Sequence, residues 1–418
     1  MRRVWKMLLG LCDRTILEDV EYDEDVGAIV AHVRPKRPKH KRCGRCGKRA
    51  PGYDDGEGRR RWRTLDLGVI KALLEADAPR VDCPVHGVTV IALPWARHDA
   101  GFTKAFEEQV AWLATHTSKS AVKQLMRIAW ATVGRIIDRV VTEVKQRVDP
   151  LEGLVRIGID EVAYRKGHRY LTVVVNHDSG KLVWAAPGAN KKTLAAFFDA
   201  LGDDGRAHIE LVSADGAPWI ADMVADRCPN ATLCLDPFHV TQWATKALDE
   251  VRREVWNEAR RSGQKALAKE LKGARFALWR NPEDLSSKQQ AKLAFIAKTN
   301  DRLYRSYLLK EQLRMVFHQD SVEDALELLD AWLAWACRSR IPAFVKLSRT
   351  IRAHRAGIEA ALIHDLSNAR VESVNGKIRV LARVAFGFRT PEALIALAML
   401  ALGGLCPPLP GRAQTAPT

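Results

Sequence analysis

The sequence predicts a multidomain chain of mixed α/β and all-α parts, with a small metal-binding module at its N-terminus. Three observations support this fold class. β-Branched runs joined by turn signals occupy residues 154–235, amphipathic helical periodicity follows over 238–366, and cysteines recur at metal-ligand spacing within residues 1–100. At 418 residues, with 47% hydrophobic and 28% charged, the chain can bury several cores and is not a disordered protein.

The chain is strongly basic. Lys and Arg number 66 against 50 Asp and Glu, so the formal net charge is +16. This surplus favours a polyanionic partner, with nucleic acid ahead of an anionic membrane. The apolar stretch from Ala393 to Cys406 is too short to span a bilayer, and Asp13 and Arg14 interrupt the N-terminal apolar stretch, so no signal peptide is expected. Eight cysteines are too few for a disulfide scaffold, and we expect a reducing, cytoplasmic environment.

Residues 1–100 form the first predicted module, which is rich in turns. Cys43 and Cys46 make one pair with two residues between them, and Cys83 and His86 make a second pair with the same spacing. Thiolates and imidazole in a set of four are the ligands that Zn²⁺ prefers in structural sites. We therefore expect these four residues to bind a structural Zn²⁺. The alternative is two unrelated pairs with free thiols.

Basic residues surround the first cysteine pair. Nine of the sixteen residues from Arg34 to Arg49 are Lys or Arg, and a second basic run occupies residues 59–63. We expect these side chains to contact DNA phosphates, with a merely solvated basic surface as the alternative. The expected contacts are Arg34, Lys36, Arg37, Lys39, Lys41, Arg42, Arg45, Lys48, Arg49, Arg60 and Arg61.

Residues 101–150 are predicted to contain a helix-turn-helix. Ser118 can cap a short helix that runs to Arg127, residues 129–131 can form a turn, and a second helix begins at Thr132. An ordinary helical hairpin has the same spacing, but the position of this unit after a metal-binding module favours DNA recognition. The residues expected to contact DNA are Lys123, Thr132 and Arg135, because base contacts cluster near the start of the second helix.

The segment 151–240 is predicted to form a mixed sheet, with three strands followed by helix, strand, helix and strand. Asp160 and Asp215 each end a predicted strand, at the edge where α/β sheets build their sites. Two carboxylates close together repel unless cations neutralise them, so the pair favours Mg²⁺ or Mn²⁺. Two solvated turn acids are the alternative interpretation.

A third acid, Glu372, lies on a helix predicted over 369–384. At 100° per residue, one side of this helix is apolar and packs on the sheet, while the next side is polar. An amphipathic helix with a solvated polar side would show the same pattern. The polar side carries Glu372, Asn375 and Arg379. Three acids around two metal ions are the arrangement that phosphodiester cleavage and joining need.

The order of these motifs resembles a DDE transposase of the ISL3 family of bacterial insertion-sequence transposases. The resembling stretches lie within residues 40–400 and are Ile159–Glu161, Ser213–Gly216, Asp236–Val240, Arg275–Leu285, Ser367–Asn375 and Ala385–Arg389. The resemblance implies an RNase H-like catalytic domain interrupted by an all-α insertion. It also implies that Asp160, Asp215 and Glu372 are the catalytic residues and bind Mg²⁺ or Mn²⁺.

The resemblance assigns supporting roles to four further residues. Asp236 and His239 match an acid-x-x-His signature. In one interpretation His239 contacts a phosphate or a flipped base. In the other, the two residues only cap a helix and pack against it. Asn375 and Arg379 would face the DNA backbone. The implied organisation is 1–100 zinc module, 101–150 helix-turn-helix, 151–240 first catalytic part, 241–365 insertion, 366–404 C-terminal catalytic helices and 405–418 disordered tail.

The predicted function is a transposase that binds the terminal inverted repeats of an insertion sequence and catalyses metal-dependent cleavage and strand transfer. Its partners would be double-stranded DNA and a second copy of itself on that DNA, with no membrane involved, in a bacterial cytoplasm at the chromosome. Two alternatives stay open. The first is a catalytically silent DNA-binding regulator derived from such an enzyme. The second is an RNase H-like nuclease that cuts without joining.

Overall fold

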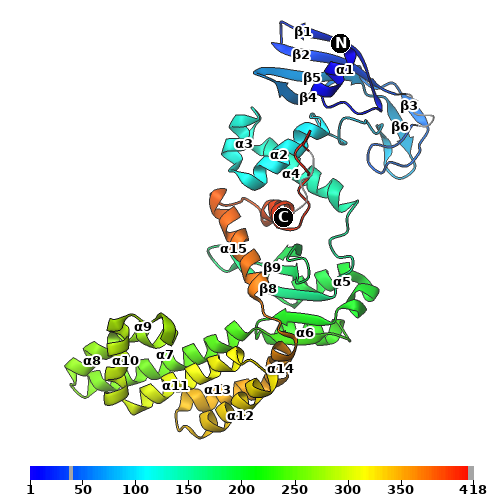
Figure 1. The fold of residues 1–418 in the computed structure, drawn as a ribbon. Helices are drawn as coiled ribbons and strands as arrows, with labels where there is room; N and C mark the ends of the chain where they lie inside the picture. Colours follow the sequence, from blue (N-terminus) through cyan, green and yellow to red (C-terminus); the bar gives the residue numbers. More distant parts are fainter. Residues whose placement is uncertain (37–40, 413–418) are drawn as a thin grey trace. The chain divides into compact units, whose positions relative to one another are not determined.

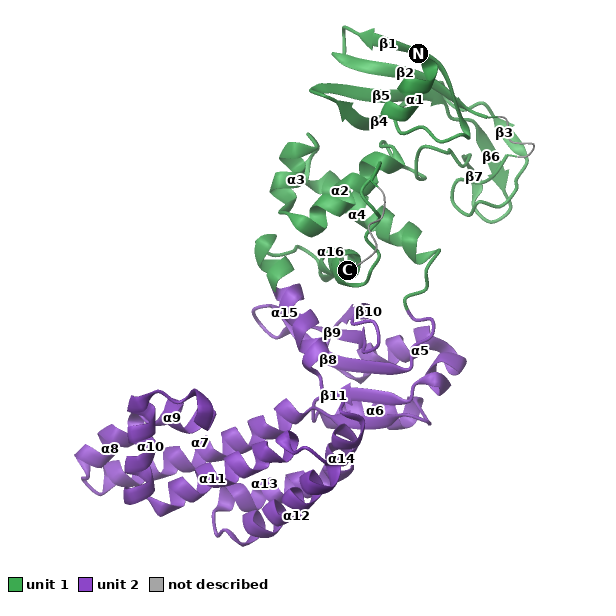
Figure 2. Ribbon diagram, in the orientation of Figure 1, with its two compact units in different colours: residues 1–150, 380–418 green, residues 151–379 purple. Residues whose placement is uncertain are grey.

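The computed structural model describes residues 1–36 and 41–412, and the chain forms two compact units (Figures 1 and 2). Unit 1 comprises residues 1–150 and 380–418, and unit 2 comprises residues 151–379. Among the described residues, none of the helices combines the length and the apolar character needed to cross a membrane. Two expected phosphate contacts, Arg37 and Lys39, lie outside the described residues, as does the end of the expected disordered tail, 413–418.

Unit 1 begins with helix α1 (Arg2–Leu8) and a four-stranded sheet that the sequence analysis did not anticipate. The strand order is β1-β2-β5-β4, with β2 parallel to β5 and the other neighbours antiparallel. Alternation of small apolar and polar residues along these strands buries one side of the sheet against Trp62 and Trp95. The strands are β1 (Thr15–Asp23), β2 (Ala28–Pro35), β4 (Arg59–Leu67) and β5 (Ile70–Asp77).

A small antiparallel sheet carries the second pair of expected zinc ligands. Its order is β3-β6-β7, built from β3 (Gly52–Asp54), β6 (Arg80–Cys83) and β7 (Gly87–Val90). The turn between β6 and β7 contains His86, and Gly87 at its end has φ +64°, a conformation that glycine adopts without strain.

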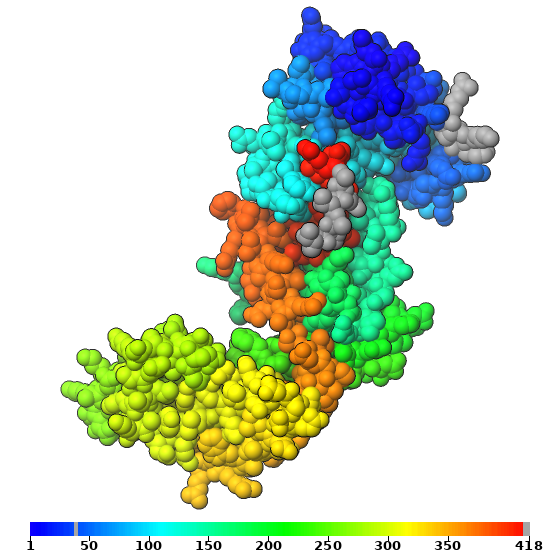
Figure 3. Space-filling view, viewed as in Figure 1, coloured from blue at the N-terminus to red at the C-terminus, as the bar shows by residue number. Residues whose placement is uncertain are grey.

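Four helices complete unit 1, and one of them comes from the C-terminus. Helix α16 (Pro391–Leu402) packs against α2 (Lys104–His116) and α4 (Trp130–Lys145), beside the short α3 (Lys119–Leu125). Figure 3 shows this C-terminal segment in red against the cyan helices. The apolar α16 buries its leucines on this bundle, and the described residues from Val380 belong to unit 1. The assignment of residues 366–404 as C-terminal catalytic helices stays a prediction. Buried Leu405 and a contact between the sulfur of Cys406 and the hydroxyl of Thr115 (3.8 Å) continue this packing into the expected tail.

Unit 2 contains a five-stranded mixed sheet in the order β10-β9-β8-β11-β12. The first three strands form an antiparallel meander, and β11 pairs in parallel with both β8 and β12. This confirms the mixed sheet that the strand and helix order of the sequence predicted. The strands are β8 (Arg156–Arg165), β9 (Arg169–Asn176), β10 (Leu182–Pro187), β11 (Leu211–Ala214) and β12 (Thr232–Leu235).

Helices α5 (Lys191–His208) and α6 (Pro218–Arg227) belong to the core on one face of this sheet. Phe197 and Phe198 of α5 pack with Ile157 and Ile159, which alternate along β8. Because side chains alternate across a strand, the residues between and after these isoleucines point to the opposite face. That face carries Gly158 and Asp160.

The described chain from Pro237 to His364 is helical. Trp332 is fully buried in its core and donates a hydrogen bond from Nε1 to the carbonyl oxygen of Leu309 (2.7 Å). The last of these helices packs against β12. The helices are α7 (Pro237–Arg261), α8 (Lys265–Lys272), α9 (Arg275–Trp279), α10 (Ser287–Thr299), α11 (Asp301–Met315), α12 (Val322–Arg338), α13 (Pro342–Ala353) and α14 (Arg355–His364), with 3-10 turns at Pro282–Asp284 and Val316–His318.

Helix α15 (Ala369–Val384) lies on the second face of the sheet, where its Val371 approaches Gly158 of β8 closely. A Cβ atom at Gly158 would lie 2.3 Å from Cγ2 of Val371 and 2.7 Å from Nε2 of His177, both shorter than any normal contact. Only glycine at this position lets the helix lie directly on the strand.

We expect Gly158→Ala to lower the free energy of unfolding by about 1–3 kcal/mol, as overpacking of a tight core does. Urea unfolding followed by circular dichroism measures this change. Gly376→Ala in α15 is the matched control, because a Cβ there meets nothing within 4 Å and alanine favours a helix by up to about 1 kcal/mol. Equal stability of Gly158→Ala and the wild type would contradict the packing.

Candidate functional site

Three aspartates lie at one edge of the sheet in unit 2. Asp215 directly follows β11 and Asp236 directly follows β12. Asp160 does not end its strand as the sequence predicted, because the hairpin between β8 and β9 continues to Arg165. However, β8 pairs with β11 only as far as Gly158, so Asp160 still lies just beyond the carboxyl end of β11. The parallel register thus brings Asp160 and Asp215 to the same edge.

The carboxyl group of Asp160 is in an environment that disfavours its charge. Burial, with the nearby charges of Asp215 and Asp236, raises its pKa from 3.8 to about 6. Two donors oppose this rise, namely the backbone N–H of Glu161 (2.7 Å) and Nδ2 of Asn375 (2.8 Å). Burial, with the nearby charges of Asp215 and Asp160, also raises the pKa of Glu161. Concentrated negative charge of this kind is what a bound cation relieves.

Asn368 joins the elements that carry these aspartates. Its Nδ2 donates to the carbonyl oxygen of Ile159 (3.3 Å), its Oδ1 accepts from the hydroxyl of Ser213 (2.5 Å), and its backbone N–H donates to Asp236 (3.1 Å). One buried side chain therefore fixes β8, β11 and the end of β12 at the start of α15. Sequence reasoning did not identify this role, although Ser213 and Asn368 both lie in the resembling stretches.

Ser213 is held from its other side by His177. Nε2 of the imidazole lies 2.7 Å from the serine Oγ. Since the serine proton goes to Asn368, the imidazole is the donor in this pair. Burial first, and then the positive charge of Arg370, lowers the pKa of His177 to about 4. The histidine is thus neutral near pH 7 and serves the framework rather than the reaction.

Helix α15 presents Glu372 and Asn375 one turn apart. Asn375 is only 1% exposed and donates to Asp160, so it does not face the DNA backbone as the resemblance implied. Its Oδ1 is buried and accepts no hydrogen bond from the described residues. Glu372 is exposed, as is Arg379. Among the described residues, the three carboxylates of Asp160, Asp215 and Glu372 are not gathered into one metal-ligand cluster.

Asp236 and His239 lie at the start of α7. Asp236 caps this helix, because its Oδ2 accepts from the backbone N–H of His239 (3.3 Å). The imidazole of His239 meets the ring of Trp243 edge to face, with centroids 5.5 Å apart. Trp243 also lies over Gly216, where a Cβ would be 2.4 Å from its ring. The capping and packing role weighed for this pair is therefore visible in the structure.

The four expected zinc ligands of unit 1 come together. Sγ of Cys83 lies 3.7 Å from Nδ1 of His86 and 3.8 Å from Sγ of Cys46, and Sγ of Cys43 lies 3.8 Å from the same imidazole nitrogen. All four ligand atoms lie within 4.8 Å of one another, the spacing of a tetrahedral site.

Backbone contacts bring the two ligand pairs of this cluster together, and the surroundings of the two buried cysteines shift the pKa of their thiols. Cys43 pairs with Ile91 beside β7, which brings the two halves of the ligand set together. The backbone N–H of Val85, followed by interactions with His86, lowers the pKa of the Cys83 thiol to about 6, as suits a thiolate ligand. Burial raises the pKa of the Cys43 thiol, a cost that a bound cation offsets.

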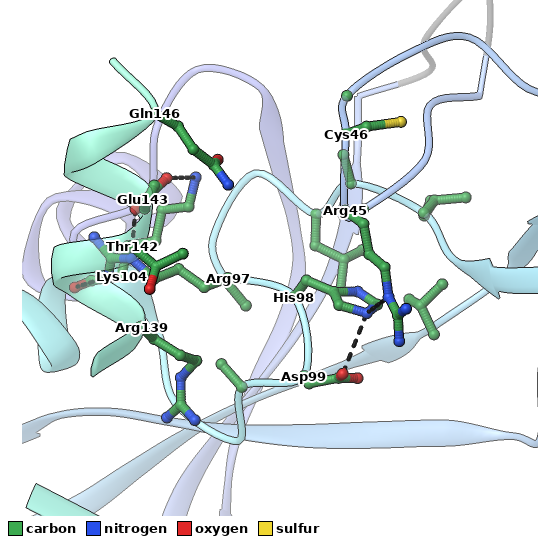
Figure 4. Close-up of a pocket in the computed structure, with 18 of the residues that line it drawn as sticks. Arg45, Cys46, Arg97, His98, Asp99, Lys104, Arg139, Thr142, Glu143 and Gln146 are labelled. Carbon is green, nitrogen blue, oxygen red and sulfur yellow. Dashed lines mark hydrogen bonds and ion pairs between the residues drawn. The ribbon is translucent and has the colours of Figure 1, made fainter. Parts of the chain in front are cut away.

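A cavity of about 890 Å³ lies between the Cys43–Cys46 turn and α4 (Figure 4). On one side, Nε of Arg45 donates to Nε2 of His98 (3.0 Å). On the other, the buried Arg97 forms ion pairs with Glu107 and Glu143. Sequence reasoning missed Arg97, which ties the connection after the metal site to α2 and α4. Further cations on the lining are Arg60, Lys104, Arg139 and Arg147.

The helix-turn-helix region has the expected order of elements. The hydroxyl of Ser118 caps α3 by accepting from the backbone N–H of Ala121 (3.2 Å). Helix α4 begins at Trp130, two residues earlier than expected, and the turn before it contains Arg127 at φ +52°. Arg135 on the first turns of α4 is exposed, as is Lys123 on α3.

Two residues expected to contact DNA have other roles in the structure. Arg61 forms ion pairs with Asp23 and Glu75, so neighbouring strands neutralise its charge. Thr132 is 8% exposed, and its Oγ1 accepts a hydrogen bond from Arg135 (3.1 Å). Arg42 donates to the carbonyl oxygen of Gly47 (2.8 Å) within the metal-binding turn. The exposed residues of the expected set are Arg34, Lys36, Arg42, Arg45, Lys48, Arg49, Arg60, Arg61, Lys123 and Arg135.

Three protein families match successive parts of the chain. A zinc finger of the transposases IS204, IS1001, IS1096 and IS1165 matches residues 39–86. The helix-turn-helix domain of transposase family ISL3 matches residues 91–141, and the ISL3 DDE transposase family matches residues 157–398.

Curated relatives agree with these matches. The chain is 55% identical to the transposase for insertion sequence element IS1557 of Mycobacterium tuberculosis, across 98% of this chain and 97% of the relative. It is 26% identical to the transposase for insertion sequence element IS1001 of Bordetella parapertussis, across 80% of this chain and 82% of the relative.

Proposed function

This chain belongs to the ISL3 family of transposases, as its motif order predicted, and we propose that it cleaves and joins DNA at the terminal inverted repeats of its element by a two-metal mechanism. The observation that carries the proposal is that Asp160 and Asp215 lie at one edge of the mixed sheet, where the charge of Asp215 helps to raise the pKa of the buried Asp160.

The mixed sheet supports an RNase H-like catalytic domain. An antiparallel meander continues into two parallel strands, α5 and α6 belong to one face, and α15 covers the other. The helices from Pro237 to His364 separate β12 from α15 along the chain. We assign these helices as the all-α insertion.

The donor set of this edge fits a hard divalent cation. Carboxylate oxygens are the ligands that Mg²⁺ and Mn²⁺ prefer, and burial with the neighbouring carboxylates raises the pKa of Asp160, a cost that a bound cation would offset. Asp160 and Asp215 would hold the cation from the sheet. Glu372, exposed on α15 one turn before Asn375, would supply the third carboxylate. Bound there, two such ions lower the pKa of an attacking water or 3′-hydroxyl and stabilise the leaving oxygen.

The chain's own residues keep this site in shape. Asn375 orients Asp160 by donating to one of its oxygens, and Asn368 fixes the strands beneath both aspartates. Buried, hydrogen-bonded supports of this kind hold ligands in position before the substrate arrives. The reaction needs no covalent bond between protein and DNA, because water and the 3′-hydroxyl are the nucleophiles.

End recognition would belong to unit 1. Structural Zn²⁺ bound by Cys43, Cys46, Cys83 and His86 would hold the basic turn, and α4 would enter the major groove with Arg135 exposed near its start. Strand transfer of two element ends to one target requires that two copies of the chain assemble on double-stranded DNA. A DNA-binding regulator without catalytic activity would need only unit 1. The three aspartates at one edge of the sheet in unit 2 argue against this alternative.

The proposal is tested by exchanging a metal ligand. We expect Asp215→Cys to lose cleavage in Mg²⁺ by about 10³-fold and to recover part of it in Mn²⁺, which accepts sulfur more readily. Asp178→Cys is the control, because Asp178 is exposed and pairs with Arg156, and this variant should cleave normally in both metals. Full activity of Asp215→Cys in Mg²⁺ would contradict the assignment. Loss of end binding in this variant would make Asp215 a structural residue.

A further inference from the structure

Helix α15 ends in a turn with an unusual residue at its tightest position. The backbone N–H of Gly387 donates to the carbonyl oxygen of Ala382 (2.8 Å), and that of Phe386 donates to Arg383 (3.0 Å). This pair of bonds defines a Schellman cap, whose left-handed position glycine normally occupies. Here the position is taken by Phe386, with φ +53°.

Side-chain packing does not offset the strain of this backbone conformation at Phe386. Its side chain is 98% exposed, more than any other large hydrophobic residue of the described chain except Met1. A bulky residue at positive φ is strained, and a strained, exposed aromatic ring that stabilises no core points to a binding role.

The neighbouring Phe388 anchors the turn to the helix-turn-helix. The ammonium group of Lys119 lies 5.1 Å from the centroid of the Phe388 ring and 5.0 Å from that of Trp130. Lys119 is buried between the two rings, and Trp130 is the first residue of α4. Phe386 therefore lies two residues from Phe388, whose contact with Lys119 ties the turn to the start of α3, beside Trp130 at the start of α4.

The charge of the segment around Phe386 indicates which class of molecule it binds. No acidic residue occurs between Glu372 and Glu392. Four exposed cations lie in this interval, and none of them forms an ion pair within the described residues. They are Lys377, Arg379, Arg383 and Arg389. An aromatic ring among unpaired cations matches the phosphates and base faces of DNA better than the surface of a second, equally basic copy.

We propose that Phe386 inserts against a base of the bound element end, either between two stacked bases or on an unpaired base. The proposal rests on the proposed function, because it needs the element end bound at the helix-turn-helix. Aromatic side chains that unstack a base step, or that stack on a freed base, serve this purpose in proteins that bend or open DNA.

The test uses full-length protein and element-end duplexes that carry 2-aminopurine at successive positions. Wild type should change the fluorescence strongly at one position, where a base loses its normal neighbour. Phe386→Ala should abolish that signal and weaken end binding roughly 5- to 100-fold, as loss of one base–aromatic stack does. Phe386→Trp should keep the signal. Phe276→Ala is the control, because Phe276 is another exposed phenylalanine in a different part of the chain.

Phe386→Gly separates binding from folding. Glycine suits the left-handed cap, so this variant should melt at the same temperature as wild type or higher, yet lack the fluorescence signal. An unchanged signal in Phe386→Ala would overturn the proposal. So would a loss of self-association in Phe386→Ala with the signal retained, since that result assigns the ring to a second copy. If wild type binds no element end at all, the proposed function fails instead.

Discussion

Asp160→Asn should reduce cleavage and strand transfer by about 10³-fold or more while leaving binding to the element end unchanged. An amide cannot neutralise a divalent cation, and the loss of metal-ion stabilisation removes several kcal/mol from the transition state. We propose that end binding belongs to unit 1, whereas Asp160 belongs to unit 2. A gel-shift titration and a cleavage assay on the same protein preparation measure both quantities.

The same variant should be more stable than the wild type. A carboxyl group whose pKa rises from 3.8 to about 6 on folding costs the folded state about 3 kcal/mol at pH 7. Asparagine removes this cost but loses one accepted hydrogen bond, so we expect a net gain of about 1–2 kcal/mol. Because the folded state holds the proton more tightly, the cost is complete above pH 6 and absent below pH 3.8. The advantage of Asp160→Asn should therefore vanish as the pH falls to about 4.

Urea unfolding without added Mg²⁺ tests this dependence, with Asp178→Asn as the control. Asp178 is exposed and paired with Arg156, so its loss should change stability little. If Asp160→Asn loses end binding together with cleavage, or is less stable at pH 7, then Asp160 is a structural residue and the assignment of the metal ligands fails.

Cys83→Ser should release zinc and abolish recognition of the element end. A structural zinc site contributes about 10–16 kcal/mol of apparent binding free energy to the fold that surrounds it. Without it, the turn that carries Arg45 and Lys48 loses its shape, and we expect end affinity to fall by about 100-fold or more. Zinc content by atomic absorption and end binding by gel shift report the two effects.

Cys337→Ser provides the matched control, because Cys337 lies on α12 in unit 2, away from the ligand cluster. It should retain both zinc and end binding. Normal zinc content in Cys83→Ser would remove Cys83 from the ligand set. Lost zinc with unchanged end binding would show that the metal site does not position the DNA contacts.

The sequence predicted the elements of unit 2 closely, because its strands and helices carry strong periodicity. The helix expected over residues 369–384 matches α15, and the strands around Asp160 and Asp215 lie where β-branched runs placed them. The four-stranded sheet of unit 1 was missed. Its strands combine charged residues such as Glu75 with small apolar residues, so the sequence pattern resembles a turn-rich basic module. The ion pairs that join these strands are visible only in the structure.

Local sequence pattern could place the proposed metal ligands Asp160 and Asp215 but not the residues that support them. Asn368 contacts Ile159, more than 200 residues earlier, and no periodicity in one sequence records such a pairing. For the same reason, Arg61 could be expected to contact DNA, because its partners Asp23 and Glu75 come from other strands. Asn375 was grouped with Glu372 and Arg379 on the polar side of α15, but the structure buries Asn375 and leaves the other two exposed.

The central claim is that the acidic edge of unit 2 performs metal-dependent cleavage and joining at the ends of the element. The most direct measurement incubates the purified chain with a plasmid that carries the DNA flanking its own gene, with and without Mg²⁺. We predict nicks at the flanking repeats and joined products in Mg²⁺ only, and neither in Asp160→Asn or Asp215→Asn. Tight repeat binding with no cut in Mg²⁺ or Mn²⁺, or cleavage that persists in both variants, would contradict the claim.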